Sequence, residues 1–205
     1  MNKYNIKLID KCRTVDWQKT LESKGYVYFS TGKYNLNLIG VRAKEHDNNE
    51  FNDAFIIDYW TSNGRRYTPV YPCTTDPGFK SLEKPVNFKG CAILVPGQYR
   101  GCFKKGYHKG KYVALVQHKP VKVFRDANKD FYMDCDESSI EEGMFGINIH
   151  KAGEASVVVD GWSAGCQVLA RGTDFRELMN IVELSIPIWG SIFTYTLLEE
   201  KDLII

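Results

Sequence analysis

The sequence lacks the features that mark several large classes of protein. No two of its six cysteines form a C-x-x-C pair, so zinc ribbons and thioredoxin-like redox motifs are unsupported. No stretch approaches the roughly 18 apolar residues of a transmembrane helix, and no signal-peptide run follows the start. A glycine-rich phosphate loop and a metalloprotease motif are also missing. We therefore expect synthesis in a cytosol, no membrane span, no metal and no cofactor.

The sequence also has no large excess of positive or negative charge. Lys and Arg number 27 against 25 Asp and Glu, which gives a net charge of +2 and does not indicate a nucleic-acid binder. The sum conceals a basic block over 84–125, with ten basic and no acidic side chains, followed by an acidic stretch over 126–142. The block either grips an anionic polymer or forms solvated hairpin faces that the acidic stretch partly neutralises. The second interpretation is favoured, and we expect no nucleic-acid partner.

What is present indicates one mainly β domain over 1–205. A chain of 205 residues that is 43% hydrophobic can bury a sizeable core without disulfides. Short β-branched and aromatic runs alternate with Gly, Pro, Asn and Asp clusters, as in β proteins. These runs predict strands over 26–29, 36–41, 55–60, 91–95, 112–117, 121–125, 145–150, 156–159 and 192–198.

Two segments are typical of helices instead. Thr14 is expected to cap a helix over 15–24 that Gly25 ends. A capping box at Asp174-x-x-Glu177 precedes apolar residues at helical spacing, and Pro187 is expected to end that helix. The sequence thus predicts a mainly β fold with a helix near each end.

One cysteine has a partner at a meaningful spacing. His150 ends the alternating segment 145–150, and Cys166 follows sixteen residues later within Ser163-Ala164-Gly165-Cys166-Gln167. A nearby imidazole can activate a thiol for acyl transfer, and N–H groups around Gly165 and Cys166 can hold an oxyanion. Ser163 is placed to fix the turn by hydrogen bonding. The alternative is a rim histidine and a core cysteine without chemistry. The other five cysteines lack a nearby base in sequence, and we interpret them as buried or incidental thiols.

The wider pattern resembles the catalytic motif of the L,D-transpeptidase family. A Phe-Gly-Ile-x-Ile segment precedes the histidine, and fifteen residues separate the histidine from the cysteine that ends Ser-x-Gly-Cys. The resemblance is good over 145–169 and loose over 67–169. The string at 74–78 is similar to the family's upstream Thr-Pro-x-Gly turn. The chain as a whole resembles a phage or prophage branch. The resemblance implies an L,D-transpeptidase-like β-sandwich or barrel that needs no cofactor.

The same resemblance implies roles for individual residues. Cys166 would be the nucleophile, His150 the base, Gly165 part of the oxyanion turn and Ser163 the motif serine. Three positions depart from the pattern: Lys151 replaces a glycine, Ala164 replaces a histidine, and Val168 replaces an arginine or asparagine.

The implied function is cysteine-dependent acyl transfer or hydrolysis on peptidoglycan stem peptides. The enzyme would act as an L,D-transpeptidase or as a carboxypeptidase or endopeptidase, at the cell wall or carried by a phage particle. The three departures leave an alternative open, which is an inactive phage structural or wall-binding protein on the same fold. The partner in either case is the cell wall.

Three further residues are predicted to contact the substrate: His108, Tyr99 and Trp162. His108 lies in a glycine-flanked loop, where it is placed to replace the histidine that Ala164 displaces. Asp126-x-Asn128-x-Asp130 has the first spacing of a calcium loop, but a hairpin turn is favoured because Phe131 occupies the glycine position.

Overall fold

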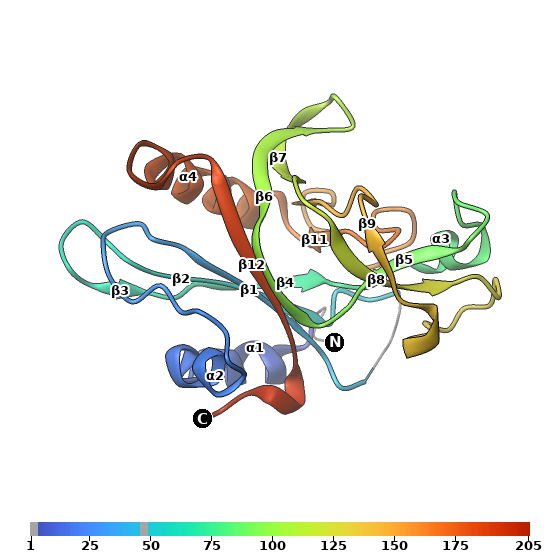
Figure 1. Ribbon diagram of the computed structural model, residues 1–205, viewed down its shortest axis with the longest axis horizontal. Coiled ribbons are helices and arrows are strands. Elements are labelled where there is room, and N and C mark those ends of the chain that lie inside the picture. The colour runs from blue at the N-terminus through green and yellow to red at the C-terminus, as the bar shows by residue number, and fades with distance from the viewer. Residues whose placement is uncertain (1–3, 46–48) are drawn as a thin grey trace.

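The computed structural model, which describes residues 4–45 and 49–205, is mainly β (Figure 1). Nine strands form one sheet in the order β1-β12-β6-β7-β10-β11-β4-β2-β3, and a further β1–β2 pairing closes eight of them into a barrel. The strands of this sheet are β1 (Asn37–Arg42), β2 (Asp53–Trp60), β3 (Arg66–Tyr67), β4 (Val70–Thr74), β6 (Gly97–His108), β7 (Tyr112–Gln117), β10 (Ile149–Lys151), β11 (Gln167–Leu169) and β12 (Ile192–Glu199).

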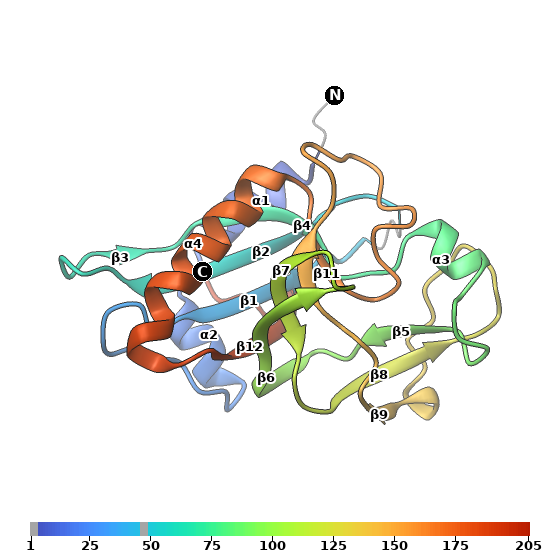
Figure 2. The ribbon, with the colours of Figure 1, turned by 90° about the horizontal axis from the view of Figure 1, so that it is seen from above.

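A separate three-stranded sheet lies beside the barrel. It has the order β5-β8-β9, with β5 (Cys91–Leu94), β8 (Val121–Asp126) and β9 (Glu141–Gly143). Figure 2 shows it at the opposite end of the molecule from β3. Short 3-10 turns cover Glu137–Ser139 and Glu200–Asp202.

A helix lies near each end of the chain, as predicted, and the short α3 in the middle was not predicted. α1 (Ile6–Cys12) and α2 (Trp17–Ser23) precede the barrel, α3 (Phe79–Glu83) follows β4, and α4 (Gly172–Trp189) precedes β12 (Figures 1 and 2). None of the helices in the described ranges is long and apolar enough to cross a bilayer.

Alternation along the strands separates two cores. In β2, Phe55 and Ile57 join a large cluster that also takes in the apolar side of α4. Ala54 and Ile56 join a second cluster with α1 and α2. Successive strand side chains point to opposite faces, so one strand supplies both cores.

Two helix boundaries differ from the prediction. Asp16 caps α2 by accepting the Lys19 N–H at 3.1 Å, whereas the Thr14 hydroxyl bonds the Lys11 carbonyl at the end of α1. The capping box at 174–177 is wrong, because α4 already begins at Gly172 and Asp174 pairs with the Arg171 side chain at 2.6 Å.

Pro187 does not end α4 either. The helix runs on to Trp189, and Gly190, with φ +84°, is its C-cap. A proline in the last turn removes one N–H donor without preventing two more helical residues, and glycine adopts the positive φ at low cost.

Two predicted strands are absent, and several strands were missed. The segment 26–29 is bonded by the side chains of Gln98 and Asn37 in place of a ladder. The segment 156–159 makes one isolated bridge, Glu50 to Val158. The missed strands are β3, β4, β6, β9 and β11, and the first half of 145–150 lies outside the ladder.

The acidic stretch partly neutralises the basic block, as favoured. Glu141 in β9 accepts from Lys89 at 2.6 Å and from Arg125 in β8 at 3.0 Å. Lys122 and Glu142 are register partners in the same pair of strands. Part of the block, in and around β5 and β8, thus pairs with the acidic stretch in the small sheet, whereas the rest lies in β6 and the β6–β7 turn of the large sheet.

A buried group of charges, which we call the charged cluster, fixes the 74–78 string to the barrel. It comprises Arg42, Asp53, Thr75 and Asp76, all nearly inaccessible. Arg42 pairs with Asp76 at 2.8 Å and donates to the Thr75 carbonyl, while Asp53 accepts from the N–H and hydroxyl of Thr75.

Candidate functional site

His150 and Cys166 lie on the same side of the sheet. β10 and β11 are parallel, with Ile149 opposite Gln167. Ile149 belongs to the large core, and the Gln167 side chain accepts from the buried Tyr195 hydroxyl at 2.7 Å. Because strand side chains alternate, His150 and Cys166 both point away from that core. The sheet register therefore places the two residues that the motif predicted on one face of the sheet.

The Cys166 thiol is half-buried and held by backbone groups. Its sulfur accepts from the Asn148 N–H at 3.4 Å and donates to the Gly146 carbonyl at 3.5 Å. Burial raises the pKa of this thiol above its ordinary value, against the opposing effects of the Asn148 N–H and the Lys109 charge. Cys166 is therefore a protonated thiol at neutral pH and needs a base to react.

His150 has the form of that base. Its Nδ1 lies 2.9 Å from the Lys151 carbonyl oxygen and 3.2 Å from the Tyr112 hydroxyl. A carbonyl only accepts, so Nδ1 carries the proton and Nε2 carries the lone pair. This Nε2 is buried and has no hydrogen-bond partner among residues 4–45 and 49–205.

The imidazole is also neutral. Burial, and after it the neighbouring His108, lowers the pKa of His150 to about 3. At neutral pH the ring is therefore unprotonated, with a lone pair on Nε2.

His108 stacks on His150. The ring centroids are 4.0 Å apart, and His108 Nδ1 lies 3.0 Å from the amide nitrogen of Asn148. The Asn148 amide oxygen accepts the Gln117 N–H at 3.0 Å, which directs the amide N–H₂ group to His108. Burial and the charges of Lys109 and Lys111 lower the pKa of His108 as well. We call His108, Tyr112, Asn148, His150 and Cys166 the thiol–imidazole cluster.

The turn before Cys166 is tightly specified. The Ser163 hydroxyl donates to the Cys166 carbonyl at 2.9 Å and accepts the Gly165 N–H at 3.1 Å, which is the bracing role predicted for it. Gly165 has φ +123°, and a Cβ built there would lie 1.9 Å from the Ala92 carbonyl oxygen. Glycine is therefore required by both conformation and space.

The two predicted oxyanion donors differ in whether they already make a hydrogen bond. The Gly165 N–H is already occupied by Ser163. The Cys166 N–H donates to no acceptor in the described part of the chain, so it is the donor left for a negative oxygen.

Of the predicted substrate-contacting residues, His108 joins the thiol–imidazole cluster and Tyr99 does not. The Tyr99 ring packs in the large core, and its hydroxyl donates to the Val95 carbonyl at 2.5 Å. Trp162 lies on the turn just before Ser163 with 46% of its surface exposed. Sequence reasoning missed Tyr112 and Asn148, although alternation from His150 places Asn148 on the same face.

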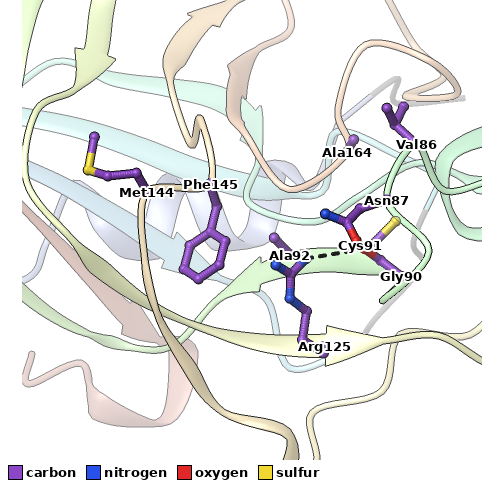
Figure 3. A pocket seen from close by; sticks show the side chains of 9 residues that line it. All are labelled: Val86, Asn87, Gly90, Cys91, Ala92, Arg125, Met144, Phe145 and Ala164. Carbon is purple, nitrogen blue, oxygen red and sulfur yellow. Dashed lines mark hydrogen bonds between the residues drawn. The ribbon is translucent and has the colours of Figure 1, made fainter.

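A cavity of about 360 Å³ adjoins the Cys166 turn (Figure 3). Ala164, which stands where the resembled family has a histidine, forms part of its wall, and Phe145 forms another part. The remaining lining residues are Val86, Asn87, Gly90, Cys91, Ala92, Arg125 and Met144.

The described residues form no cluster of metal-ligating side chains. Within the described ranges no group of three or more His, Cys, Asp or Glu side chains could hold an ion. Asn128 donates to Asp130 and Asp134, so the 126–130 string is a loop closed by its own side chains. Cys12, Cys73, Cys91 and Cys102 are buried thiols, and Cys135 is exposed.

Comparison with known proteins returns no relative. No protein-family model, no curated protein and no solved structure matches the chain. What the structure defines is a mainly β protein with an eight-stranded barrel that carries a half-buried thiol beside a neutral histidine pair.

Proposed function

We propose that the protein is a cysteine acyltransferase or hydrolase of the L,D-transpeptidase type. One observation carries the proposal: Cys166 lies on the same sheet face as His150, whose unprotonated Nε2 has no partner among the described residues. Nucleophilic catalysis by cysteine needs such a base, held in one tautomer by its other nitrogen. Lys151 and Tyr112 hold Nδ1 in this way.

The first half of the reaction forms a thioester. The thiol turns from the Gly146 carbonyl towards His150, and its proton passes from Sγ to Nε2. The thiolate attacks a peptide carbonyl, a C–S bond forms, and the Cys166 N–H donates a hydrogen bond to the negative oxygen. His150 then returns the proton to the leaving amine as the C–N bond breaks.

The second half resolves the thioester. Water attack gives a carboxylic acid and makes the protein a carboxypeptidase or endopeptidase. Attack by the amine of a second chain gives a new amide and makes it a transpeptidase. In both cases His150 removes the proton of the attacking group. It returns this proton to the Cys166 sulfur, which leaves as a thiol when the C–S bond breaks.

The substrate class follows from the resemblance over 145–169. We propose peptidoglycan stem peptides as the acyl donors and the cell wall as the place of action, reached from a phage particle. The accessible position of the turn before Cys166, with Trp162 about half exposed, supports access for a polymer-borne peptide.

A second candidate is a wall-binding or phage structural protein that keeps the fold without turnover. It is favoured by one contact, since the Cys166 thiol bonds Gly146 and makes no hydrogen bond to His150 in the described residues. Ala164 and Val168, where the family has polar side chains, agree with it.

Incubation with purified muropeptides tests the two candidates against each other. The wild-type protein, Cys166→Ala and the buried-thiol control Cys102→Ala are compared by product mass. We expect shortened or cross-linked products from wild type and Cys102→Ala and none from Cys166→Ala. Binding to the wall without product from any of the three would support the second candidate and overturn the first.

A further inference from the structure

We infer that the cavity beside the Cys166 turn is a subsite for a carboxylate of the acyl donor, held by Arg125. The inference rests on the proposed function and adds to it a required chemical group on the substrate. Of the nine residues that line the cavity, Arg125 is the charged one (Figure 3).

The residues that line the cavity are next to residues that contact the Cys166 sulfur and its turn. Phe145 lines it and precedes Gly146, whose carbonyl oxygen lies 3.5 Å from the Cys166 sulfur. On the other side, the site of a Cβ on Gly165 would meet the Ala92 carbonyl, and Ala92 is the register partner of Arg125. A ligand bound at the sulfur therefore extends into this cavity over a short distance.

The Arg125 guanidinium is fixed with one edge left open. Its Nε donates to Glu141 at 3.0 Å, its Nη1 donates to the Gly90 carbonyl at 3.3 Å, and its Cζ lies 4.7 Å from the Phe145 ring centroid. Its Nη2 donates to no group in the part of the chain that the structure describes. A planar guanidinium held in this way loses little entropy when it binds a carboxylate.

The local charge also favours an anion. Glu141 is shared between Arg125 and Lys89, so two cations face one carboxylate. Hydrogen bonds from these two cations lower the pKa of Glu141, which stays ionised and keeps the guanidinium in place. Val86, Met144 and Phe145 supply apolar wall, and Asn87 adds an uncharged polar group. The cavity thus fits a short apolar stem that ends in a carboxylate.

Matched thioesters test the inference. The probes are phenyl monothioesters of succinic, glutaric and adipic acid, each paired with the analogue in which the free carboxylate is a primary amide. Attack by Cys166 releases thiophenolate and leaves the acyl group on the sulfur, which intact-protein mass spectrometry follows. The proteins are wild type, Arg125→Gln and Lys122→Gln, the last of which removes an exposed charge from the same strand.

We expect wild type to prefer the carboxylate to the amide by about tenfold for the chain length that spans sulfur and guanidinium. Arg125→Gln is expected to reduce this preference to about twofold or less, and Lys122→Gln to retain it. Equal preferences in wild type and Arg125→Gln would overturn the inference. Alkylation by iodoacetamide, which is neutral, should proceed at the same rate in all three proteins.

Failure of the proposed function gives a different pattern. In that case Cys166 reacts with iodoacetamide but with none of the thioesters. Glutarate binding, followed by the NMR shift of the Arg125 Nε–H, then decides the subsite separately. A shift that saturates in wild type supports the subsite, and no shift overturns it.

Discussion

The charged cluster and the thiol–imidazole cluster are two polar groups in one barrel, and they differ in charge. Arg42 and Asp53 make six hydrogen bonds to Thr75, Leu94 and Ala43, and Asp76, which pairs with Arg42, leaves only its Oδ2 without a partner in the described residues. His150 bonds through Nδ1 alone, and its Nε2 is left without a partner in the described residues.

The difference separates a structural role from a chemical one. Opposite charges that are buried together stabilise each other only while every member is present. A neutral imidazole with a free lone pair can take the proton of a neutral thiol. The thiolate and imidazolium that result pair with each other, so no buried charge is left without a partner.

Removal of Arg42 should affect stability most. Arg42→Met leaves Asp53 and Asp76 buried without a counter-charge, and we expect the free energy of unfolding to fall by about 3–5 kcal/mol. The matched control is Arg13→Met, whose ion pair with Asp10 is exposed and should be worth less than about 1 kcal/mol. Urea unfolding measures both, and equal losses would contradict a structural role for the charged cluster.

The turn before Cys166 should be nearly as sensitive. Gly165→Ala adds the cost of a positive φ to a clash with the Ala92 carbonyl, so we expect a loss of about 2–5 kcal/mol. Gly146→Ala has φ +74° but nothing within 4 Å of the added Cβ, and should lose about 1–2 kcal/mol. Thermal unfolding of the two variants isolates the clash, and a larger loss at Gly146 would show that the turn is not packed as described.

His150 should make the fold sensitive to acid. Its pKa is about 3 in the folded chain and about 6.5 when unfolded, so the unfolded chain binds the proton first as the pH falls. Stability is therefore lost from about pH 6.5 downwards, by about 3 kcal/mol at pH 4.

The burial of Asp53, whose pKa is raised to about 7, acts in the opposite direction, so a variant is needed to isolate His150. The difference in unfolding free energy between wild type and His150→Gln, measured from pH 7 to pH 4, should shift against wild type as the pH falls. A difference that does not change with pH would mean that His150 is solvated.

The smallest effect is expected at Ser163. Ser163→Ala removes the hydrogen bonds to the Cys166 carbonyl and the Gly165 N–H, and should lower the free energy of unfolding by about 1–3 kcal/mol. Ser23→Ala removes one half-exposed bond to Thr20 and serves as the control, with a loss below about 1 kcal/mol. Chemical denaturation compares them, and a silent Ser163→Ala would show that the turn keeps its shape without the hydroxyl.

Dense β-branched and aromatic runs predicted some strands correctly, and a glycine-interrupted strand was missed. The prediction over 112–117 coincides with β7, where Tyr112, Val113 and Val116 form such a run, whereas the run over 156–159 makes only an isolated bridge. β6 was missed although it is the longest strand, because Gly101, Gly106 and adjacent lysines interrupt its pattern. Its pairing with β7 and β12 decides its conformation, and that information is not local.

The candidate site was likewise predictable only where local sequence spacing decides the geometry. The spacing of His150 and Cys166 predicted neighbours, and the parallel pairing of β10 with β11 brings them to one face. The stacking of His108 on His150 depends on β6 and β7 reaching β10 across the closed sheet. Tyr99 shares the strand of His108 but lies at its other end, which composition alone did not reveal.

The most direct measurement is the mass of the protein after exposure to a stem peptide. Wild type should gain the mass of the acyl fragment, peptide mapping should place that mass on Cys166, and His150→Gln should gain it far more slowly. A wild-type thiol that iodoacetamide alkylates, but that takes up no acyl group from stem peptides of several wall types, would contradict the account.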